Sequence, residues 1–206
     1  MYTILRSFHT SNTKTYTSLY KTYVRPIIEY NCSIWNPNLT SNIRKIESIQ
    51  TKFTKTLCQK LNIKYQNYAH RLEMLNLETL EVRRLKTDLI LLFKIHNNLL
   101  DIKFDEFFTK NLITTNYNLR RHTNYLKTPN ITKTNTRQNF FSNRIVRVWN
   151  KLPQEIISTQ SLPNFKYKLD KLNLAEYTNL IFWPECSKPN KQTKYHLITP
   201  GLDKAL

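Results

Sequence analysis

The sequence predicts a mainly α fold: a helical module of about six helices with an irregular basic loop insertion. Three observations lead to this prediction. The chain of 206 residues contains a single glycine, Gly201, and so has few residues suited to the left-handed turns of tight β-hairpins. Apolar residues recur at spacings of three and four through most of the first half, as on one face of a helix. Between residues 110 and 138, Thr, Asn and basic residues replace them.

The first half is expected to form four helices. Because proline disrupts the helical hydrogen-bond ladder, a helix over 16–34 is expected to be kinked or broken at Pro26. Thr40 or Ser41 is expected to cap a second helix that ends near Leu57. A short helix follows around 68–75, and the apolar run 89–93 predicts that a helix over 78–98 is the central buried one. The first helix is expected to bury one face, made of Tyr16, Leu19, Tyr23, Ile27, Tyr30 and Ile34.

The second half is expected to contain two further helices. One covers 139–151, with Phe141 and Trp149 facing the core, and the other is capped by Ser161. A short strand is expected near Tyr125. The chain is thereby divided into a helical half (1–108), a basic irregular segment (109–138), C-terminal helices (139–173) and a flexible tail (174–206).

Basic side chains outnumber acidic ones and are unevenly distributed. The chain has 32 Lys and Arg against 14 Asp and Glu, a net charge of +18. Half of this excess lies in residues 107–154, where arginine outnumbers lysine, so a coding bias toward lysine does not account for it. Such an excess predicts RNA, DNA or both as partners. The segment holds no acid, and its nine bases are Lys110, Arg120, Arg121, Lys127, Lys133, Arg137, Arg144, Arg147 and Lys151.

Seven residues of this segment are candidate nucleic-acid contacts. Guanidinium groups bind phosphates through paired donors, and the interleaved aromatic rings stack on unpaired bases. Lys127 belongs to this set. Arg144 and Arg147 also belong to it, although on the helix expected over 139–151 they equally suit an ordinary solvated face. The other four candidates are expected in a loop that offers no acids for them to pair with; they are Arg120, Arg121, His122 and Arg137.

The sequence offers little for catalysis, and neither a metal site nor a cofactor is expected. Its aspartates are scattered, whereas a two-metal polymerase or nuclease site needs converging carboxylates. No Cys-x-x-Cys or His-Glu-x-x-His spacing indicates zinc. The three cysteines favour reduced thiols and an intracellular location, in nucleus or cytoplasm. No membrane partner is expected, because the apolar run 89–93 is far shorter than the ~20 residues of a membrane-spanning helix.

Several short motifs occur in an order that resembles a known family. They are Val24-Arg25-Pro26-Ile27-Ile28-Glu29-Tyr30, Trp35-Asn36-Pro37, Arg83-Arg84-Leu85, Phe140-Phe141-Ser142-Asn143-Arg144-Ile145, Trp149-Asn150-Lys151-Leu152-Pro153 and Ser161-Leu162-Pro163-Asn164-Phe165. Together they resemble the region that follows the polymerase core in jockey-like non-LTR retrotransposon reverse transcriptases, over roughly residues 17–172. Where that family has Arg-Gly-His, this chain has Arg120-Arg121-His122.

The resemblance implies that the chain is the thumb-like and C-terminal part of a transposable-element RNA-directed DNA polymerase. The paired polymerase aspartates are absent, so the isolated chain is expected to have no enzyme activity and to work with an upstream polymerase core. Its expected function is to bind template RNA or an RNA–DNA hybrid through the backbone. The alternative is a helical protein-interaction module with incidental basic charge. A small nuclease or transferase is disfavoured by the scarcity of carboxylates.

Overall fold

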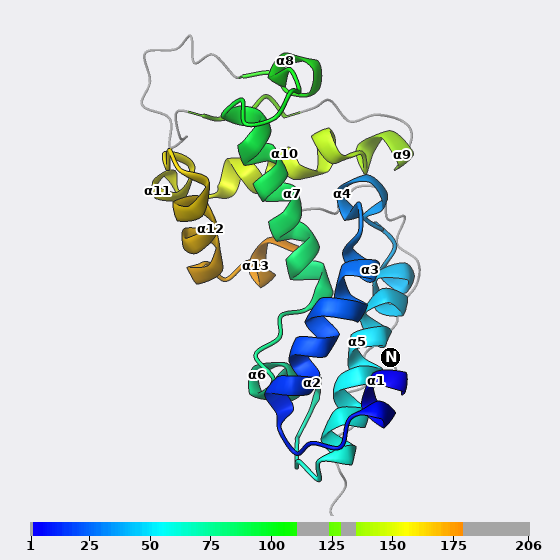
Figure 1. The fold of residues 1–206 in the computed structure, drawn as a ribbon. Coiled ribbons are helices and arrows are strands. Elements are labelled where there is room, and N and C mark those ends of the chain that lie inside the picture. The colour runs from blue at the N-terminus through cyan, green and yellow to red at the C-terminus, as the bar shows by residue number, and fades with distance from the viewer. Residues whose placement is uncertain (1, 111–123, 129–134, 179–206) are drawn as a thin grey trace, which may run out of the picture.

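The computed structural model describes residues 2–110, 124–128 and 135–178, and it confirms the mainly α fold (Figure 1). The helical residues fall into more segments than the six predicted. In chain order the segments are α1 (Tyr2–Ser7), α2 (Thr13–Leu19), the π-helical turn η1 (Tyr20–Val24), α3 (Arg25–Glu29), α4 (Cys32–Trp35), α5 (Thr40–Lys60), α6 (Tyr68–Met74), α7 (Leu80–His96), α8 (Phe104–Phe107), α9 (Asn135–Gln138), α10 (Phe141–Lys151), α11 (Gln154–Ile157), α12 (Leu162–Lys171) and α13 (Ala175–Thr178).

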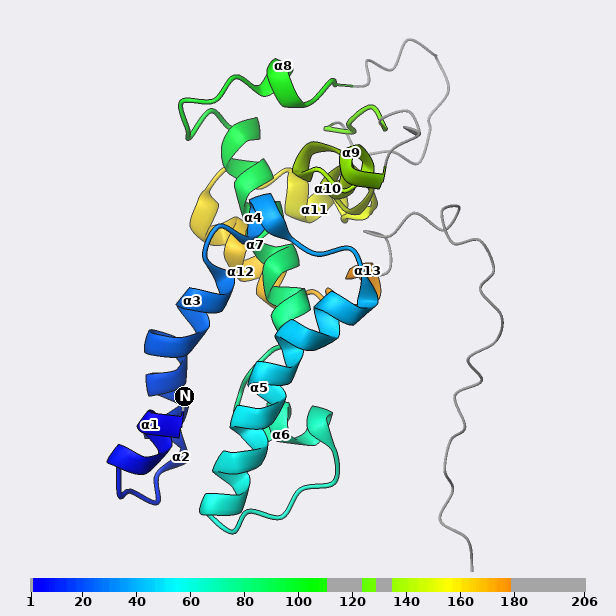
Figure 2. The same ribbon diagram turned by 90° about the vertical axis from the view of Figure 1, so that its right-hand side faces the viewer.

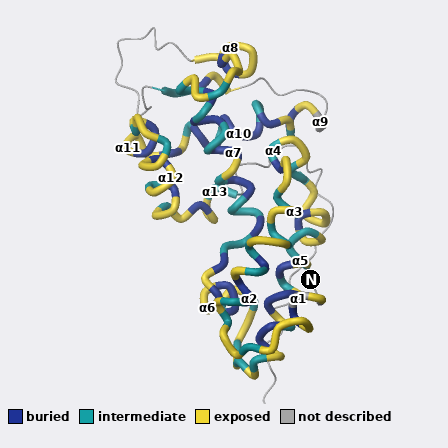
Figure 3. The backbone as a smooth tube through the Cα atoms, in the orientation of Figure 1, coloured by how far each residue is buried: buried dark blue, intermediate teal, exposed yellow. Residues whose placement is uncertain are grey.

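The molecule is elongated, and α7 joins two groups of helices (Figures 1 and 2). We call the group around α2, α5 and α6 the N-terminal lobe. In its core the ring of Tyr20 stacks on that of Phe53 at 4.4 Å between centroids. Figure 3 shows the buried faces of these helices turned toward one another. The core residues of this lobe are Leu5, Tyr16, Tyr20, Phe53, Leu57, Leu72, Leu75 and Leu77.

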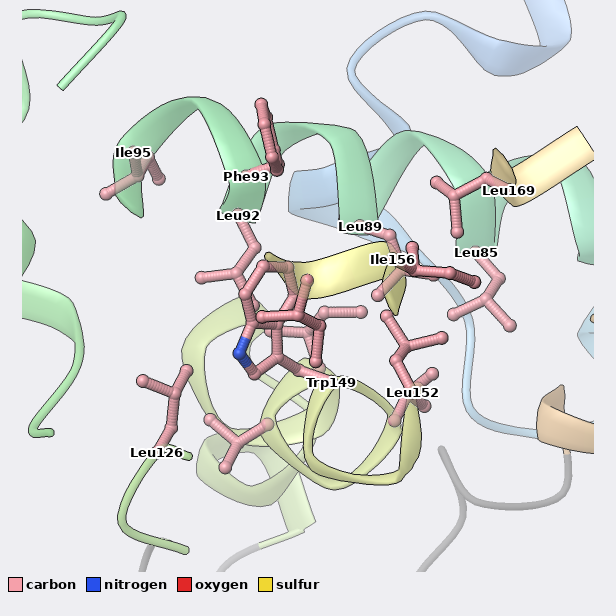
Figure 4. Packing of buried hydrophobic residues seen from close by; sticks show 14 of the residues in the cluster. Leu85, Leu89, Leu92, Phe93, Ile95, Leu126, Trp149, Leu152, Ile156 and Leu169 are labelled. Carbon is pink, nitrogen blue, oxygen red and sulfur yellow. The ribbon is translucent and has the colours of Figure 1, made fainter. Parts of the chain in front are cut away.

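The C-terminal lobe is built from α7, α8, α10, α11 and α12 around a larger core. Trp149 is fully buried among leucines of α7 and Ile156 of α11, so its predicted inward orientation is confirmed (Figure 4). The rings of Phe93 and Phe165 stack at 4.1 Å and join α7 to α12. Phe108, the last residue of the predicted helical half, and Phe141 of α10 belong to the same core.

Asparagine takes the role of glycine at the ends of helices. Residues with a positive φ are usually glycines, and asparagine also tolerates this conformation well. In this chain, with its single glycine, four asparagines adopt φ values between 47° and 53° where helices or loops turn. The left-handed turns that helix termini need are therefore made without glycine. These residues are Asn31, Asn62, Asn76 and Asn98.

The prediction that Tyr23, Ile27, Tyr30 and Ile34 are buried with Tyr16 is wrong, and η1 explains why. These four side chains lie on the surface, whereas Tyr16 is in the core. A π-helical turn fits one extra residue into the helix, so the buried face moves on by one position. Val24 accordingly packs against the N-terminal core. The turn ends two residues before Pro26, which a continuous α-helical ladder does not accommodate.

Two segments predicted to be irregular contain short helices. Within 109–138, α9 covers the last four residues, and the strand expected near Tyr125 is a single antiparallel bridge between Lys110 and Leu126. No β-strand forms within the described ranges. Within 174–206, Leu174 is buried and α13 follows it, while residues 179–206 lie outside the described ones.

Candidate nucleic-acid interface

Residues 124–128 form a short strap that is held against α10 by side chains of that helix. The Asn150 amide pairs with Leu126 as a neighbouring strand would, since its Nδ2 donates to the Leu126 carbonyl at 2.8 Å and its Oδ1 accepts from the Leu126 N–H at 2.9 Å. The indole N–H of Trp149 donates to the carbonyl of Asn124 at 3.0 Å. The Leu126 side chain is fully buried in the core. The next residue, Lys127, is thereby placed at the surface.

A cavity of about 230 Å³ lies between this strap, α8 and the first turns of α10. The backbone N–H of Lys127 donates to the carbonyl of Thr109 at 2.8 Å and closes one side of it. We call this cavity the basic pocket. It is lined by Phe107, Phe108, Thr109, Lys127, Thr128, Ser142, Asn143 and Val146.

The charges around the basic pocket are mostly positive. Lys127, Arg137 and Lys110 are exposed, and Arg147 is half-buried. Ser142 and Asn143 in the first turn of α10 line the pocket, so the positive end of the helix dipole lies beside it. Opposing these charges, two exposed acids occupy the first turn of α8, next to Phe107; they are Asp105 and Glu106.

The predicted contacts fall into three groups. Lys127 and Arg137 are exposed in the C-terminal lobe, as a phosphate contact requires, and Arg147 is partly accessible. Arg144 is buried. The remaining predicted contacts lie outside the described residues, namely Arg120, Arg121 and His122.

The prediction that Arg144 lies on the surface as a nucleic-acid contact is wrong. Its side chain is 2% exposed and forms an ion pair with Asp88 of α7, at 3.0 Å between Nη2 and Oδ2. The other donors of the guanidinium are also used, because Nη1 donates to the carbonyl of Asn139 at 2.9 Å and Nη2 to that of Ser33 at 2.6 Å. One arginine thus joins α4, α7 and α10.

Asp88 is the centre of a polar network that joins α4 and the residue after it to α7 and α10. Asn36 donates to the Asp88 carboxylate at 3.4 Å, and its own Oδ1 accepts from Nε of Arg84 at 2.9 Å. Burial raises the pKa of Asp88, and the Arg144 guanidinium opposes that shift. Burial lowers the pKa of Arg84, whose two Nη atoms are buried without hydrogen-bond partners. Asn36, Arg84 and Arg144, which come from three separate motifs of the sequence, therefore meet Asp88 in one structural network.

Sequence reasoning missed the basic pocket because its parts come from three separated stretches. Spacing along a helix placed Phe141 and Trp149 correctly but gives no information on which loop packs over them. The asparagine that follows Trp149 was the available signal, because a half-buried amide at the end of a helix needs polar partners. Asn150 finds them in the backbone of Leu126.

Metal-binding side chains and thiols were the other candidates for chemistry in the described residues. No group of three His, Cys, Asp or Glu among them is placed to hold a metal ion. Cys32 and Cys58 are buried free thiols, and burial raises the pKa of both, which disfavours the reactive thiolate.

Within the described part of the chain, no helix combines the length and apolar character needed to cross a membrane.

Comparison with known proteins finds a partial likeness to a protein of Caenorhabditis elegans, the uncharacterized protein B0403.1. The two are 29% identical over 82 residues, which are 40% of this chain and 41% of that protein. The chain thus matches about two fifths of the length of this relative. No family model and no solved structure matches the chain. Its function has to be argued from its own residues.

Proposed function

We propose that this chain is a noncatalytic helical part of a retrotransposon reverse transcriptase that holds template RNA or an RNA–DNA hybrid through the phosphate backbone at the basic pocket. The main support is the position of Lys127. Its backbone is fixed by the strap and by Thr109, while its side chain is exposed at the pocket. Because the backbone is already ordered, only the Lys127 side chain has to be ordered when its ammonium binds a phosphate.

The size and chemistry of the basic pocket suit a phosphate group better than a whole nucleotide. Its volume of about 230 Å³ is below the roughly 300–1,000 Å³ of typical small-molecule sites. Thr109, Thr128 and Ser142 line it beside Lys127, and their hydroxyl groups are able to donate hydrogen bonds to phosphate oxygens. A pocket of this kind fixes the position of a backbone without reading its sequence.

Aromatic side chains near the pocket favour a strand with accessible bases. Phe107 lines the pocket and is 40% exposed, and Phe140, directly before α10, is 52% exposed. Exposed aromatic rings stack on unpaired bases of any sequence. Asp105 and Glu106 on α8 repel phosphates, so the backbone is expected to follow the side of the pocket that leads toward Arg137.

The assignment to a reverse transcriptase depends on the resemblance of the ordered motifs, and a polymerase core is the expected partner. The noncatalytic role is proposed because the paired aspartates of a polymerase site are absent from the sequence. The isolated chain is accordingly expected to extend no primer on an RNA template with magnesium. Extension that is abolished by mutating one of the chain's own acids would contradict this.

The salt dependence of RNA binding tests the proposed contact with phosphates. The purified chain is titrated against a fluorescent single-stranded RNA at several salt concentrations from about 50 to about 200 mM. The logarithm of the binding constant is expected to fall linearly with the logarithm of the salt concentration, with a slope of about −3 for four phosphate contacts. Failure to bind at low salt, or a flat salt response, would overturn the proposal.

A further inference from the structure

The structure leaves apolar side chains uncovered along the outer side of α3 and α4. Tyr23, Ile27, Tyr30 and Ile34 expose 62%, 78%, 73% and 77% of their surface. Trp35 is 40% exposed, and its indole N–H donates to the carbonyl of Tyr30. We call these five residues the apolar stripe. Single exposed apolar residues are common on protein surfaces, but a succession along one segment is typical of an interaction site.

The segment that bears the apolar stripe is held firmly by its opposite side. Glu29 of α3 accepts two hydrogen bonds from the Arg83 guanidinium of α7, and Nη2 lies 3.0 Å from Oε2. This side-on pairing fixes α3 against α7, and the π-helical turn before α3 sets its rotation so that Ile27 faces outward. The apolar stripe is therefore presented in one conformation, which lowers the entropic cost of binding.

The stretch of sequence that carries the apolar stripe is basic, which favours an acidic partner. Glu29 is the single acid in residues 2–46, and it is occupied by Arg83. The same residues contain six bases, Arg6, Lys14, Lys21, Arg25, Arg44 and Lys45. Like charges disfavour a second copy of this chain, whose net charge is +18, because both surfaces would carry the same sign.

The aliphatic members of the apolar stripe distinguish a protein partner from nucleic acid. Ile27 and Ile34 have neither donors for phosphates nor planar rings for stacking on bases, so they gain free energy from burial against other apolar groups. Tyr23 and Ile27 lie four residues apart, the spacing that matches the face of a helix. We propose that the apolar stripe docks a partner protein through an amphipathic helix whose apolar face is flanked by acidic residues.

This surface is separate from the basic pocket, so the proposal goes beyond nucleic-acid binding and is tested separately from it. The probe is a synthetic helical peptide with leucines on one face and glutamates beside them, added to the full chain and followed by fluorescence anisotropy. A second peptide has lysine in place of every glutamate. The acidic peptide is expected to bind about tenfold more tightly than the basic one, a difference of about 1.4 kcal/mol, and to weaken as salt is added.

Two matched double variants locate the binding. Ile27→Glu/Ile34→Glu is expected to abolish binding of the acidic peptide, and the uncharged pair Ile27→Ser/Ile34→Ser to weaken it at least severalfold. Leu99→Glu/Tyr167→Glu adds the same charge at exposed apolar positions elsewhere and is expected to leave binding unchanged. All these positions are at least half exposed, so the fold is expected to survive, and circular dichroism checks it.

Five results would overturn the proposal. Failure of the acidic peptide to bind at millimolar concentration would show that the apolar stripe does not dock such a helix. Equally tight binding of the basic peptide would show that acidic residues are not recognised. Equal loss of binding in the Leu99→Glu/Tyr167→Glu variant would show nonspecific association. Dimerisation of the chain that Ile27→Glu/Ile34→Glu abolishes would identify a second copy as the occupant. Competition between single-stranded RNA and the peptide for the apolar stripe would identify nucleic acid instead.

Discussion

Arg144 and Lys127 both belong to the acid-free segment 107–154, but the structure places them in opposite environments. Arg144 is buried where α4, α7 and α10 meet and is paired with Asp88, whereas Lys127 is exposed at the basic pocket. The local sequence gives both the same appearance, because neither has an acid nearby in the chain. Asp88 lies 56 residues before Arg144. Positive charge therefore indicates a binding residue only after its partners in space are known.

The largest expected effect comes from removing the buried arginine. Arg144→Ala leaves the Asp88 carboxylate buried without its counter-ion, and the free energy of unfolding is expected to fall by about 3–5 kcal/mol. That is a large share of the roughly 5–15 kcal/mol that stabilises a typical domain. Urea denaturation followed by circular dichroism measures the loss.

Two further variants serve as controls for this prediction. Arg137→Ala removes an exposed arginine and is expected to change the free energy of unfolding by about 0–1 kcal/mol. Replacing both partners, Arg144→Met/Asp88→Leu, is expected to recover much of the stability that Arg144→Ala loses, because neither member of this ion pair is then left buried without the other. A loss below about 1 kcal/mol in Arg144→Ala would be typical of an exposed arginine and would contradict its burial in an ion pair with Asp88.

An intermediate effect is expected at the strap. Asn150→Ala removes both hydrogen bonds to the backbone of Leu126, and leaving these groups unsatisfied is expected to cost about 1–3 kcal/mol. Because the strap positions Lys127, the salt slope of RNA binding is expected to become shallower by about 0.7, the contribution of one phosphate contact. Asn42→Ala, an exposed asparagine of the N-terminal lobe, is the control and is expected to change neither quantity. If the Asn150→Ala variant is destabilised but binds RNA as the wild type does, the strap does not position the RNA-binding residues.

Periodicity in the sequence was sufficient to predict the helices and the inward orientation of Trp149, since both depend on residues within a few turns. It failed where the cause was a change in helical geometry or a distant partner. The extra residue accommodated in η1 turned Tyr23 and Ile27 outward, and no count of spacings reveals such a turn. Burial of Arg144 required an acid from another helix. The basic pocket required the pairing of Asn150 with a loop 24 residues away.

The smallest expected effect on stability accompanies the most direct test of the proposed function. Lys127→Ala/Arg137→Ala removes two exposed cations, so the free energy of unfolding is expected to change by about 0–1 kcal/mol per residue. The salt slope of single-stranded RNA binding is expected to become shallower by about 1.4, because two phosphate contacts are lost. The matched control, Lys14→Ala/Lys55→Ala, removes two exposed lysines of the N-terminal lobe and is expected to keep the wild-type slope. A slope that is unchanged in the first variant, or equally reduced in the control, would contradict the assignment of RNA binding to the basic pocket.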